Sequence, residues 1–477
     1  MIPKISIIKE QKEDCSTATL FEKSERPELT FFTEREQEFI KKTLAKDPVC
    51  TIHRVPELYF LAEIDDSKEA YLQLELARKA GSGLFSVLKE KEIQTVQLSV
   101  DSPVLAAAFM EGLLLSTYRF DKYKKEKDNF NLEQVFIICD KITDEQVVEL
   151  TTITRAVFAA RDLVNEPLSF LNATQFSAEM ERMGTEAGFS VEVFSKQKIE
   201  ALKMGGLLAV NKGSIDPPTF NILEWKPANA QNKQPVVLVG KGVVYDTGGM
   251  SLKPTANSMD YMKSDMAGAA VMLSTLYAVA KNKLPIHVVA LIPATDNRPD
   301  GNAYVPGDVI TMFDGTTVEV RNTDAEGRLI LADALSYAKK YNPQLVIDCA
   351  TLTGAADIVA GPHGAVVMGN SLEDLEKLKA SGQKTYERLI EVPLWEEYAK
   401  ALKSNIADLN NLGSRDGQAT IAGKFLEYFT DYKWIHIDAA STSYFKEANH
   451  YQPAGGTGFG VRLLYSFLYD SVSKPSE

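Results

Sequence analysis

Apolar residues recur along the chain with two different spacings, and these predict alternating strands and helices. In the first third, residues 95–100 and 134–140 are short apolar runs typical of buried strands, whereas residues 68–83 and 102–120 repeat their apolar positions with helical spacing. The charged run 121–129 interrupts this pattern, and we expect it to form a solvated loop.

A longer helical pattern follows at residues 144–167, and a proline at its end marks where a helix stops. Residues 266–283 and 327–341 also have helical periodicity. They lie among β-rich runs at 190–195, 234–240, 285–294, 343–354 and 434–440. Strands that alternate with helices favour a largely parallel sheet flanked by helices.

These patterns predict an α/β protein of two domains. Residues 1–150 would form a smaller N-terminal α/β domain that carries no motif with a recognisable chemistry. Residues 151–477 would form a larger C-terminal domain with a mainly parallel central sheet between helices. A chain of 477 residues with 45% hydrophobic content is long enough to bury a core in each.

Charge and cysteine content limit the classes of function. The net charge of −13 argues against broad binding to nucleic acid or anionic membranes. Four cysteines occur without a CxxC pair, which indicates reduced, mostly buried thiols. The N-terminus lacks the apolar core of a secretion signal, and the apolar run 267–280 is too short to span a bilayer. We therefore expect a cytoplasmic protein.

Acidic and basic residues gather just after the predicted strands of the second domain. Ligands collect at the carboxyl ends of strands in open parallel sheets, so we expect these side chains to share one site. The candidates are Lys241, Asp246, Lys253, Asp265, Asp324, Glu326 and Arg328.

Clustered carboxylates raise one another's pKa, and a pair of divalent cations would compensate their charge. The chain has five histidines and no HExxH motif, so such a site would consist mainly of carboxylates. Oxygen ligands suit magnesium or manganese, and zinc if a nitrogen ligand is added. A lysine joins such a site only as a neutral amine.

Each of these residues alone has a simpler explanation. A single aspartate near a helix start is commonly a cap, and a single lysine is commonly a surface charge. The segment "GKGVVYDTGG" fits neither GxGxxG nor GxxxxGK[ST]. His436 and Asp438 in "WIHIDAA" are better explained as a hydrogen-bonded strand histidine and its neighbour than as ligands. The prediction therefore depends on the coincidence of several residues at strand ends.

Several segments resemble the leucyl aminopeptidase family of dinuclear metallo-exopeptidases. "NTDAEGRLILADAL" is similar to the family signature, and four other segments match family blocks in the same order along roughly residues 150–465. They are "VGKGVVYDTGGMSLKP", "MKSDMAGAAV", "GNAYVPGDV" and "ATLTGA". The resemblance implies a metal-dependent enzyme that releases N-terminal residues from peptides, with residues 151–477 as its catalytic domain and residues 1–150 serving assembly.

The resemblance also implies roles for individual residues. Asp246 and Glu326 would bridge the two metals, and Lys253 and Arg328 would be the catalytic pair. A bicarbonate ion near Arg328 would act as general base. The full set of metal ligands would be Lys241, Asp246, Asp265, Asp324 and Glu326. Asp324 would also bind through its backbone carbonyl. The pocket for an apolar first residue such as Leu or Met would be lined by Met262, Thr351, Leu352 and Gly354.

The cofactors implied by the resemblance are two divalent ions per subunit, manganese or zinc, with magnesium as an option at one site. The implied assembly is a homo-hexamer, a dimer of trimers. Two alternatives stay open within the family: a dipeptidase for cysteinylglycine, and a relative with an added DNA-binding role. A cofactor-binding oxidoreductase is disfavoured, because no dinucleotide fingerprint is present.

Overall fold

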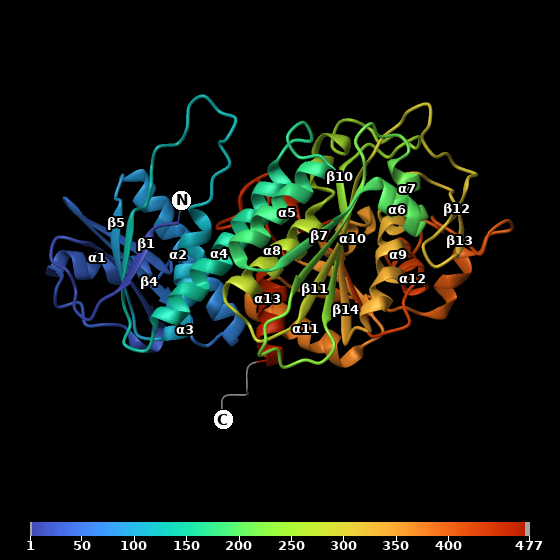
Figure 1. Cartoon of the computed structure of the whole chain (residues 1–477). Helices are drawn as coiled ribbons and strands as arrows, with labels where there is room; N and C mark the ends of the chain where they lie inside the picture. Colours follow the sequence, from blue (N-terminus) through green and yellow to red (C-terminus); the bar gives the residue numbers. More distant parts are fainter. Residues whose placement is uncertain (1, 473–477) are drawn as a thin grey trace. The chain divides into compact units, whose positions relative to one another are not determined.

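The computed structural model describes residues 2–472, which fold as two compact units (Figure 1). The first unit comprises Met1–Phe158 and Glu447–Ala454, and the second comprises Ala159–Lys446 and Gly455–Glu477. Within the described residues, none of the helices combines the length and the apolar character that crossing a bilayer requires.

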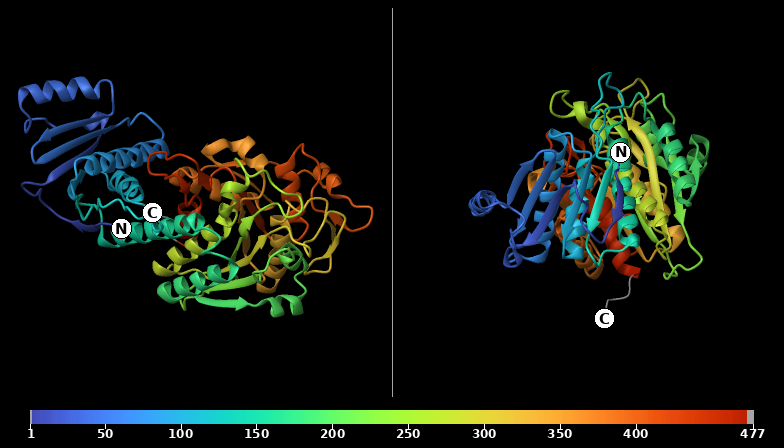
Figure 2. Two further views of the ribbon diagram at one scale, coloured as in Figure 1. Left: turned by 90° about the horizontal axis from the view of Figure 1, so that it is seen from above. Right: turned by 90° about the vertical axis from the view of Figure 1, so that its left-hand side faces the viewer.

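The first unit contains a six-stranded sheet in the order β1-β6-β5-β2-β4-β3, parallel throughout except for β3 against β4. Helix α1 covers one face of this sheet, and α2 and α3 cover the other (Figure 2). The elements are β1 (Lys4–Ile7), β2 (Ser16–Glu22), η1 (Lys23–Glu25), α1 (Glu34–Leu44), β3 (Val49–Arg54), β4 (Glu57–Ile64), α2 (Ala70–Glu90), β5 (Thr95–Val100), α3 (Pro103–Ser116) and β6 (Gln134–Ile138).

The predicted strands and helices of this unit are confirmed, and residues 121–129 lie outside any helix or strand. The strands β1 to β4 and the helix α1 were not predicted from the sequence. Of the four cysteines, all of them free, Cys15 is the one that is partly exposed.

The second unit is built on a nine-stranded sheet in the order β16-β15-β18-β14-β9-β11-β8-β7, with β10 also paired to β11. The four central strands β18, β14, β9 and β11 are parallel, whereas β15, β8 and β7 add antiparallel pairs toward the edges. The strands are β7 (Ser190–Phe194), β8 (Thr219–Trp225), β9 (Val236–Gly240), β10 (Gly242–Asp246), β11 (Val288–Asn297), β14 (Leu345–Ala350), β15 (Ala365–Gly369), β16 (Leu389–Glu391) and β18 (Trp434–Asp438).

Helices cover both faces of this sheet, with α5 and α8 on one side and α9 and α12 on the other (Figure 1). Helix α4 (Asp144–Asn165) begins in the first unit and ends in the second. The other helical elements of the second unit are α5 (Ala173–Ala187), α6 (Lys196–Leu202), α7 (Gly205–Asn211), η2 (Met259–Ser264), α8 (Ala267–Lys281), α9 (Gly327–Ala338), η3 (Lys339–Tyr341), α10 (Gly354–Ala360), η4 (Gly361–His363), α11 (Leu372–Thr385), η5 (Glu396–Leu402), α12 (Gln418–Glu427) and α13 (Val461–Val472).

Every residue of β9, β11 and β14 is buried. Strands covered on both faces read as continuous apolar runs, which explains why the sequence revealed them. The predicted α/β class with a mainly parallel central sheet is confirmed.

Two strand predictions need correction. The apolar run was expected to end at residue 240, but the chain continues as the strand β10, because the ten-residue β11 offers pairing partners beyond the end of β9. Asp324 and Glu326 were expected just after a strand of the main sheet. The strand before them is β13, which lies in a separate sheet with the order β12-β13-β17; these strands are β12 (Val309–Thr311), β13 (Thr317–Glu319) and β17 (Leu409–Asn410).

The start of α8 lies against the ends of β9 and β14 because it carries glycine there. A Cβ on Gly268 would overlap the carbonyl of Cys349, and a Cβ on Gly240 would lie 2.5 Å from Cα of Ala269. Side chains at these positions would push the helix away from the sheet. The close approach brings Lys241, just after β9, next to Asp265, just before α8.

Candidate metal centre

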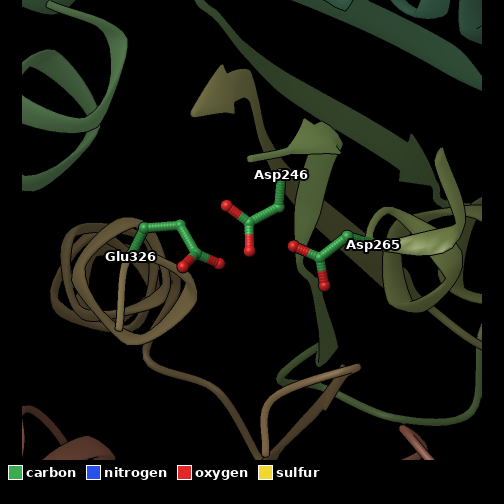
Figure 3. Close-up of side chains that lie close together, drawn as sticks. All are labelled: Asp246, Asp265 and Glu326. Atoms are coloured by element: carbon green, nitrogen blue, oxygen red, sulfur yellow. The ribbon is translucent and has the colours of Figure 1, made fainter. Parts of the chain in front are cut away.

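Three buried carboxylates converge at one end of the central sheet. Asp246 ends β10, Asp265 lies between η2 and α8, and Glu326 directly precedes α9. Each is at most 4% exposed. One oxygen from each lies within 4.8 Å of the others, and Figure 3 shows the three carboxylates pointing toward one another. Such a group of oxygen ligands could hold a divalent cation.

Lys241 lies between two of these carboxylates. Its Nζ is 2.6 Å from Asp265 Oδ1 and 2.9 Å from Glu326 Oε1, and it donates to the carbonyl oxygen of Thr351 at 2.9 Å. The side chain is only 3% exposed, so Lys241 is not a surface charge.

Lys253 links the carboxylate of Asp246 to a fourth carboxylate, that of Asp324. Its Nζ lies 3.0 Å from Asp246 Oδ2 and 2.5 Å from Asp324 Oδ1. The side chains of Lys253 and Asp324 are 15% and 32% exposed, which places them nearer the solvent than the other acids. Four carboxylates and two ammonium groups leave this cluster with a formal charge of −2.

The pKa values reflect this crowding of negative charge. Burial, together with Glu326, raises the pKa of Asp246 to about 7, although Lys253 opposes the shift. Burial also raises the pKa of Asp265 well above its ordinary value, with Lys241 opposing. Burial acts in the same direction on Glu326, but Lys241 and Lys253 outweigh it and lower its pKa. The lysines therefore offset only part of the cost of burying these acids.

Among the described residues, two oxygens of the cluster have neither a hydrogen-bond donor nor an ion-pair partner, whereas a third buried oxygen, Asp324 Oδ1, is contacted by Lys253. Asp265 Oδ2 and Glu326 Oε2 are fully buried, and no donor among residues 2–472 reaches either of them. Buried carboxylate oxygens without a partner are costly, and a bound cation would satisfy both. The donor set therefore fits a divalent metal.

Arg328 lies in the first turn of α9 and is 2% exposed. Its Nη1 donates to the carbonyl of Asn411 at 2.8 Å, while its buried Nε has no partner within the part of the chain that the structure describes. Burial lowers the pKa of Arg328 to about 10, with Glu326 and Asp438 opposing the shift. The guanidinium thus keeps a free N–H donor beside the cluster.

Two of the four predicted pocket residues, Thr351 and Met262, contact Asp265. Thr351 donates its hydroxyl to Asp265 Oδ1 at 2.8 Å. Leu352 follows it, half-buried, and its N–H is bound by Asp438 at 3.0 Å. Met262 is half-buried in η2, and the space beside the Gly354 Cα is open. The structure thus joins Thr351 to the acidic cluster, and, among the described residues, a Cβ added at position 354 would meet no atom beyond its own helix turn within 4 Å.

His436 has the structural role expected from the sequence. Its Nδ1 lies 2.6 Å from Asp348 Oδ1, and the other oxygen of Asp348 accepts a hydrogen bond from the indole of Trp434 at 2.7 Å. Asp438 accepts from the Thr353 hydroxyl at 2.7 Å and so fixes the loop after β14.

Two buried asparagines lie beside the acids and were not predicted from the sequence. Asn297, the last residue of β11, donates to Asp246 Oδ1 at 2.8 Å and to the carbonyl of Thr323 at 3.0 Å. Its place at a strand end could have identified it. Asn411 binds the segment around Asp324 from a distant part of the chain, and no local motif indicated it.

The chain matches known protein families over both units. Residues 158–465 match the catalytic domain of the cytosol aminopeptidase family, and residues 66–127 match its N-terminal domain. The chain belongs to the cytosol aminopeptidase family. The resemblance noted in the sequence is thereby confirmed, and the protein is an aminopeptidase, a hydrolase of peptide bonds.

Relatives and solved structures agree with this membership. The probable cytosol aminopeptidase of Chlorobium limicola is 47% identical over 382 residues, covering 76% of this chain and 75% of the relative. That of Geobacter sp. is 40% identical over 412 residues, covering 84% of each. The bottromycin maturation enzyme BotP in complex with Mn is 30% identical, with a TM-score of 0.85 over 96% of this chain and 99% of BotP.

A mutant of tomato leucine aminopeptidase shares the fold, with a TM-score of 0.87, 24% identity, and coverage of 98% of this chain and 97% of the tomato chain.

Proposed function

We propose that this aminopeptidase uses two divalent metal ions, manganese or zinc with magnesium as an option at one site, to release apolar N-terminal residues such as Leu and Met from peptides. The observation that carries the proposal is the buried group of Asp246, Asp265 and Glu326, two of whose oxygens lack donors. The Mn complex of BotP supports manganese as one suitable ion.

The metal ligands in this proposal are the cluster residues. Asp246 and Glu326 would serve both ions, and Asp324 would contribute its carbonyl as well as its carboxylate. The residues that would hold the ions are Lys241, Asp246, Asp265, Asp324 and Glu326. Bound ions would act as Lewis acids on the scissile carbonyl and lower the pKa of a bound water.

Lys253 and Arg328 are the catalytic pair of the proposal. Lys253 is the more exposed of the two lysines, and its ammonium would stabilise the oxyanion of the tetrahedral intermediate. Arg328 would hold a bicarbonate ion through its unpaired Nε N–H, at the start of α9, where anions are favoured. The held anion would take a proton from water and pass it to the leaving amine.

Cleavage at the N-terminus follows from the placement of Asp265. A free α-amino group would lie against this carboxylate, and an internal peptide bond has no amine to offer there. Met262, Thr351, Leu352 and Gly354 would then surround the first side chain, and their lack of charge favours an apolar one.

The proposal includes a homo-hexameric assembly, a dimer of trimers, in the cytoplasm, without nucleic-acid or membrane partners. The net charge of −13 supports the absence of nucleic acid, and the relatives' name, cytosol aminopeptidase, supports the location. Sedimentation of the purified chain tests the assembly, and a fully active monomer would contradict it.

A metal add-back assay tests the function. The chelated protein, shown to be metal-free by elemental analysis, should be inactive and should regain activity with manganese, zinc or magnesium. Leu- and Met-terminated peptides should be cleaved faster than Arg-terminated ones. Preference for cysteinylglycine would instead make it a dipeptidase, and full activity without metal would refute the proposal. A mobility shift with DNA at moderate salt tests the DNA-binding alternative.

A further inference from the structure

Asn411 makes an unusual number of hydrogen bonds to one short segment. Its side chain is fully buried. The amide oxygen Oδ1 accepts from the backbone N–H groups of Arg321 at 2.8 Å and Asn322 at 3.3 Å. The amide nitrogen Nδ2 donates to the carbonyls of Asn322 at 2.8 Å and Ala325 at 3.4 Å. One side chain thus pairs with the backbone of three residues in the segment 321–325.

The backbone of Asn411 extends this contact in both directions. Its N–H donates to the carbonyl of Glu319 at 3.0 Å, next to the parallel pairing of β13 with β17. Its own carbonyl accepts the hydrogen bond from Arg328 Nη1 at 2.8 Å. Asn411 therefore contacts residues from the end of β13 to the first turn of α9.

The segment between these two elements carries Asp324 and Glu326, and Arg328 follows it in the first turn of α9. The segment has no regular secondary structure of its own, so helix or sheet hydrogen bonds do not fix its shape. Asn297 and Tyr304 hold its middle at the Thr323 carbonyl, at 3.0 and 2.7 Å. Asn411 is the contact that joins the beginning of the segment to Arg328.

We infer that Asn411 is a positioning residue for the proposed metal-dependent reaction, acting through the segment 321–328. An asparagine suits this role because its amide both accepts and donates, and the segment offers both N–H and C=O groups. Aspartate could accept but not donate, and alanine could do neither. The expected effect of Asn411 on metal binding and turnover rests on the proposed function. The hydrogen bonds of Asn411 to the segment do not depend on that function.

A merely structural buried asparagine would behave differently. Asn221 in β8 provides a matched control: it is also fully buried, and its Nδ2 donates to the Ile292 carbonyl at 3.0 Å and to the Thr219 hydroxyl at 3.1 Å. None of these partners belongs to the metal centre. Asn221→Ala should therefore lower stability without changing the chemistry.

The experiment compares Asn411→Ala, Asn411→Ser and Asn221→Ala in the full-length protein. Manganese affinity is measured by equilibrium dialysis, turnover at saturating manganese, and stability by thermal melting. Loss of a residue that orients ligands typically costs 10–100-fold in metal affinity, and a catalytic group displaced by about 1 Å costs roughly 100-fold in rate. Both Asn411 variants should show such losses, whereas Asn221→Ala should lose only stability.

Hydrogen exchange on the unmutated protein keeps the inference testable if the variants fold poorly. The N–H groups of Arg321 and Asn322 should be protected with or without manganese, because Asn411 accepts both. Rapid exchange in both states would overturn the inference, as would Asn411 variants that bind manganese and turn over like Asn221→Ala. If the wild type shows no metal-dependent activity, the proposed function fails, while the exchange result still decides whether Asn411 orders the segment.

Discussion

Replacing Gly327 by alanine should abolish most of the activity while leaving the fold intact. Gly327 is the first residue of α9, and Lys241 passes directly over it. An added Cβ would lie 2.8 Å from Lys241 Nζ and closer still to Cε. Since Nζ is held between Asp265 and Glu326, the lysine cannot swing aside without breaking these ion pairs.

The size of the effect follows from these distances. Non-bonded carbon atoms prefer separations of about 3.5–4.0 Å, and the added Cβ would lie 2.4 Å from Lys241 Cε, so the lysine or the helix must shift by roughly 1.1–1.6 Å. A displacement of about 1 Å at a reacting centre costs on the order of 100-fold in rate. Stability should change little, because alanine gains up to about 1 kcal/mol over glycine in a helix and offsets part of the weakened ion pairs.

The assay measures kcat, bound manganese and the melting temperature of Gly327→Ala beside Gly83→Ala. Gly83 is a helical glycine in α2 whose added Cβ would meet only the Phe60 ring at 3.9 Å, an ordinary contact. The control should keep full activity. Wild-type turnover and metal content in Gly327→Ala would show that the position of Lys241 does not matter to the reaction.

Three further changes test the centre and its surroundings. Asp246→Asn should lose bound metal and nearly all activity, because Asp246 would serve both ions; unchanged metal content by elemental analysis would reject the ligand assignment. Arg328→Ala should keep its metals and lose about 10²–10⁴-fold in kcat with little change in KM. Added bicarbonate should stimulate the carbonate-free wild type much more than the variant. Equal stimulation of both proteins would show that Arg328 does not bind the anion. Burial raises the pKa of Asp333 to about 7, although three backbone N–H groups oppose the shift. Because this pKa in the folded state lies above the pKa in the unfolded state, protonated Asp333 contributes stability at acidic pH. That contribution is lost as the pH rises toward and through 7. The free energy of unfolding, measured with urea at pH 5 and pH 8 without metal, should therefore fall more for the wild type than for Asp333→Asn, and equal slopes would contradict this.

The acids of the centre were predictable because each stands next to an element with a strong pattern. Asp265 precedes the apolar helix α8, and Glu326 precedes α9, whose twelve residues are all buried. The pairing of the lysines was not predictable. Lys241 contacts Glu326 across 85 positions of the chain, and only the folded structure shows which lysine meets which carboxylate.

The strand predictions were wrong where the partner of a strand decides the structure. The predicted strand ended at Gly240, yet the residues up to Asp246 also pair with β11, in the same parallel direction as β9. Likewise, β13 has a strand-like pattern, but nothing in that pattern indicates that its partners are the short strands β12 and β17. Pairing depends on residues far away in the chain, which local periodicity does not encode.

The residues that hold the acidic loops share a chemical feature that explains why they escaped a search based on charge. Asn297 and Asn411 are neutral amides, and each joins the segment that carries Asp324 to another part of the unit. A lysine or arginine in either place would add a positive charge and compete with a bound cation for the same carboxylates. An aspartate would deepen the formal charge of −2. A neutral amide instead fixes the loops through hydrogen bonds alone, so the excess negative charge stays available to metal.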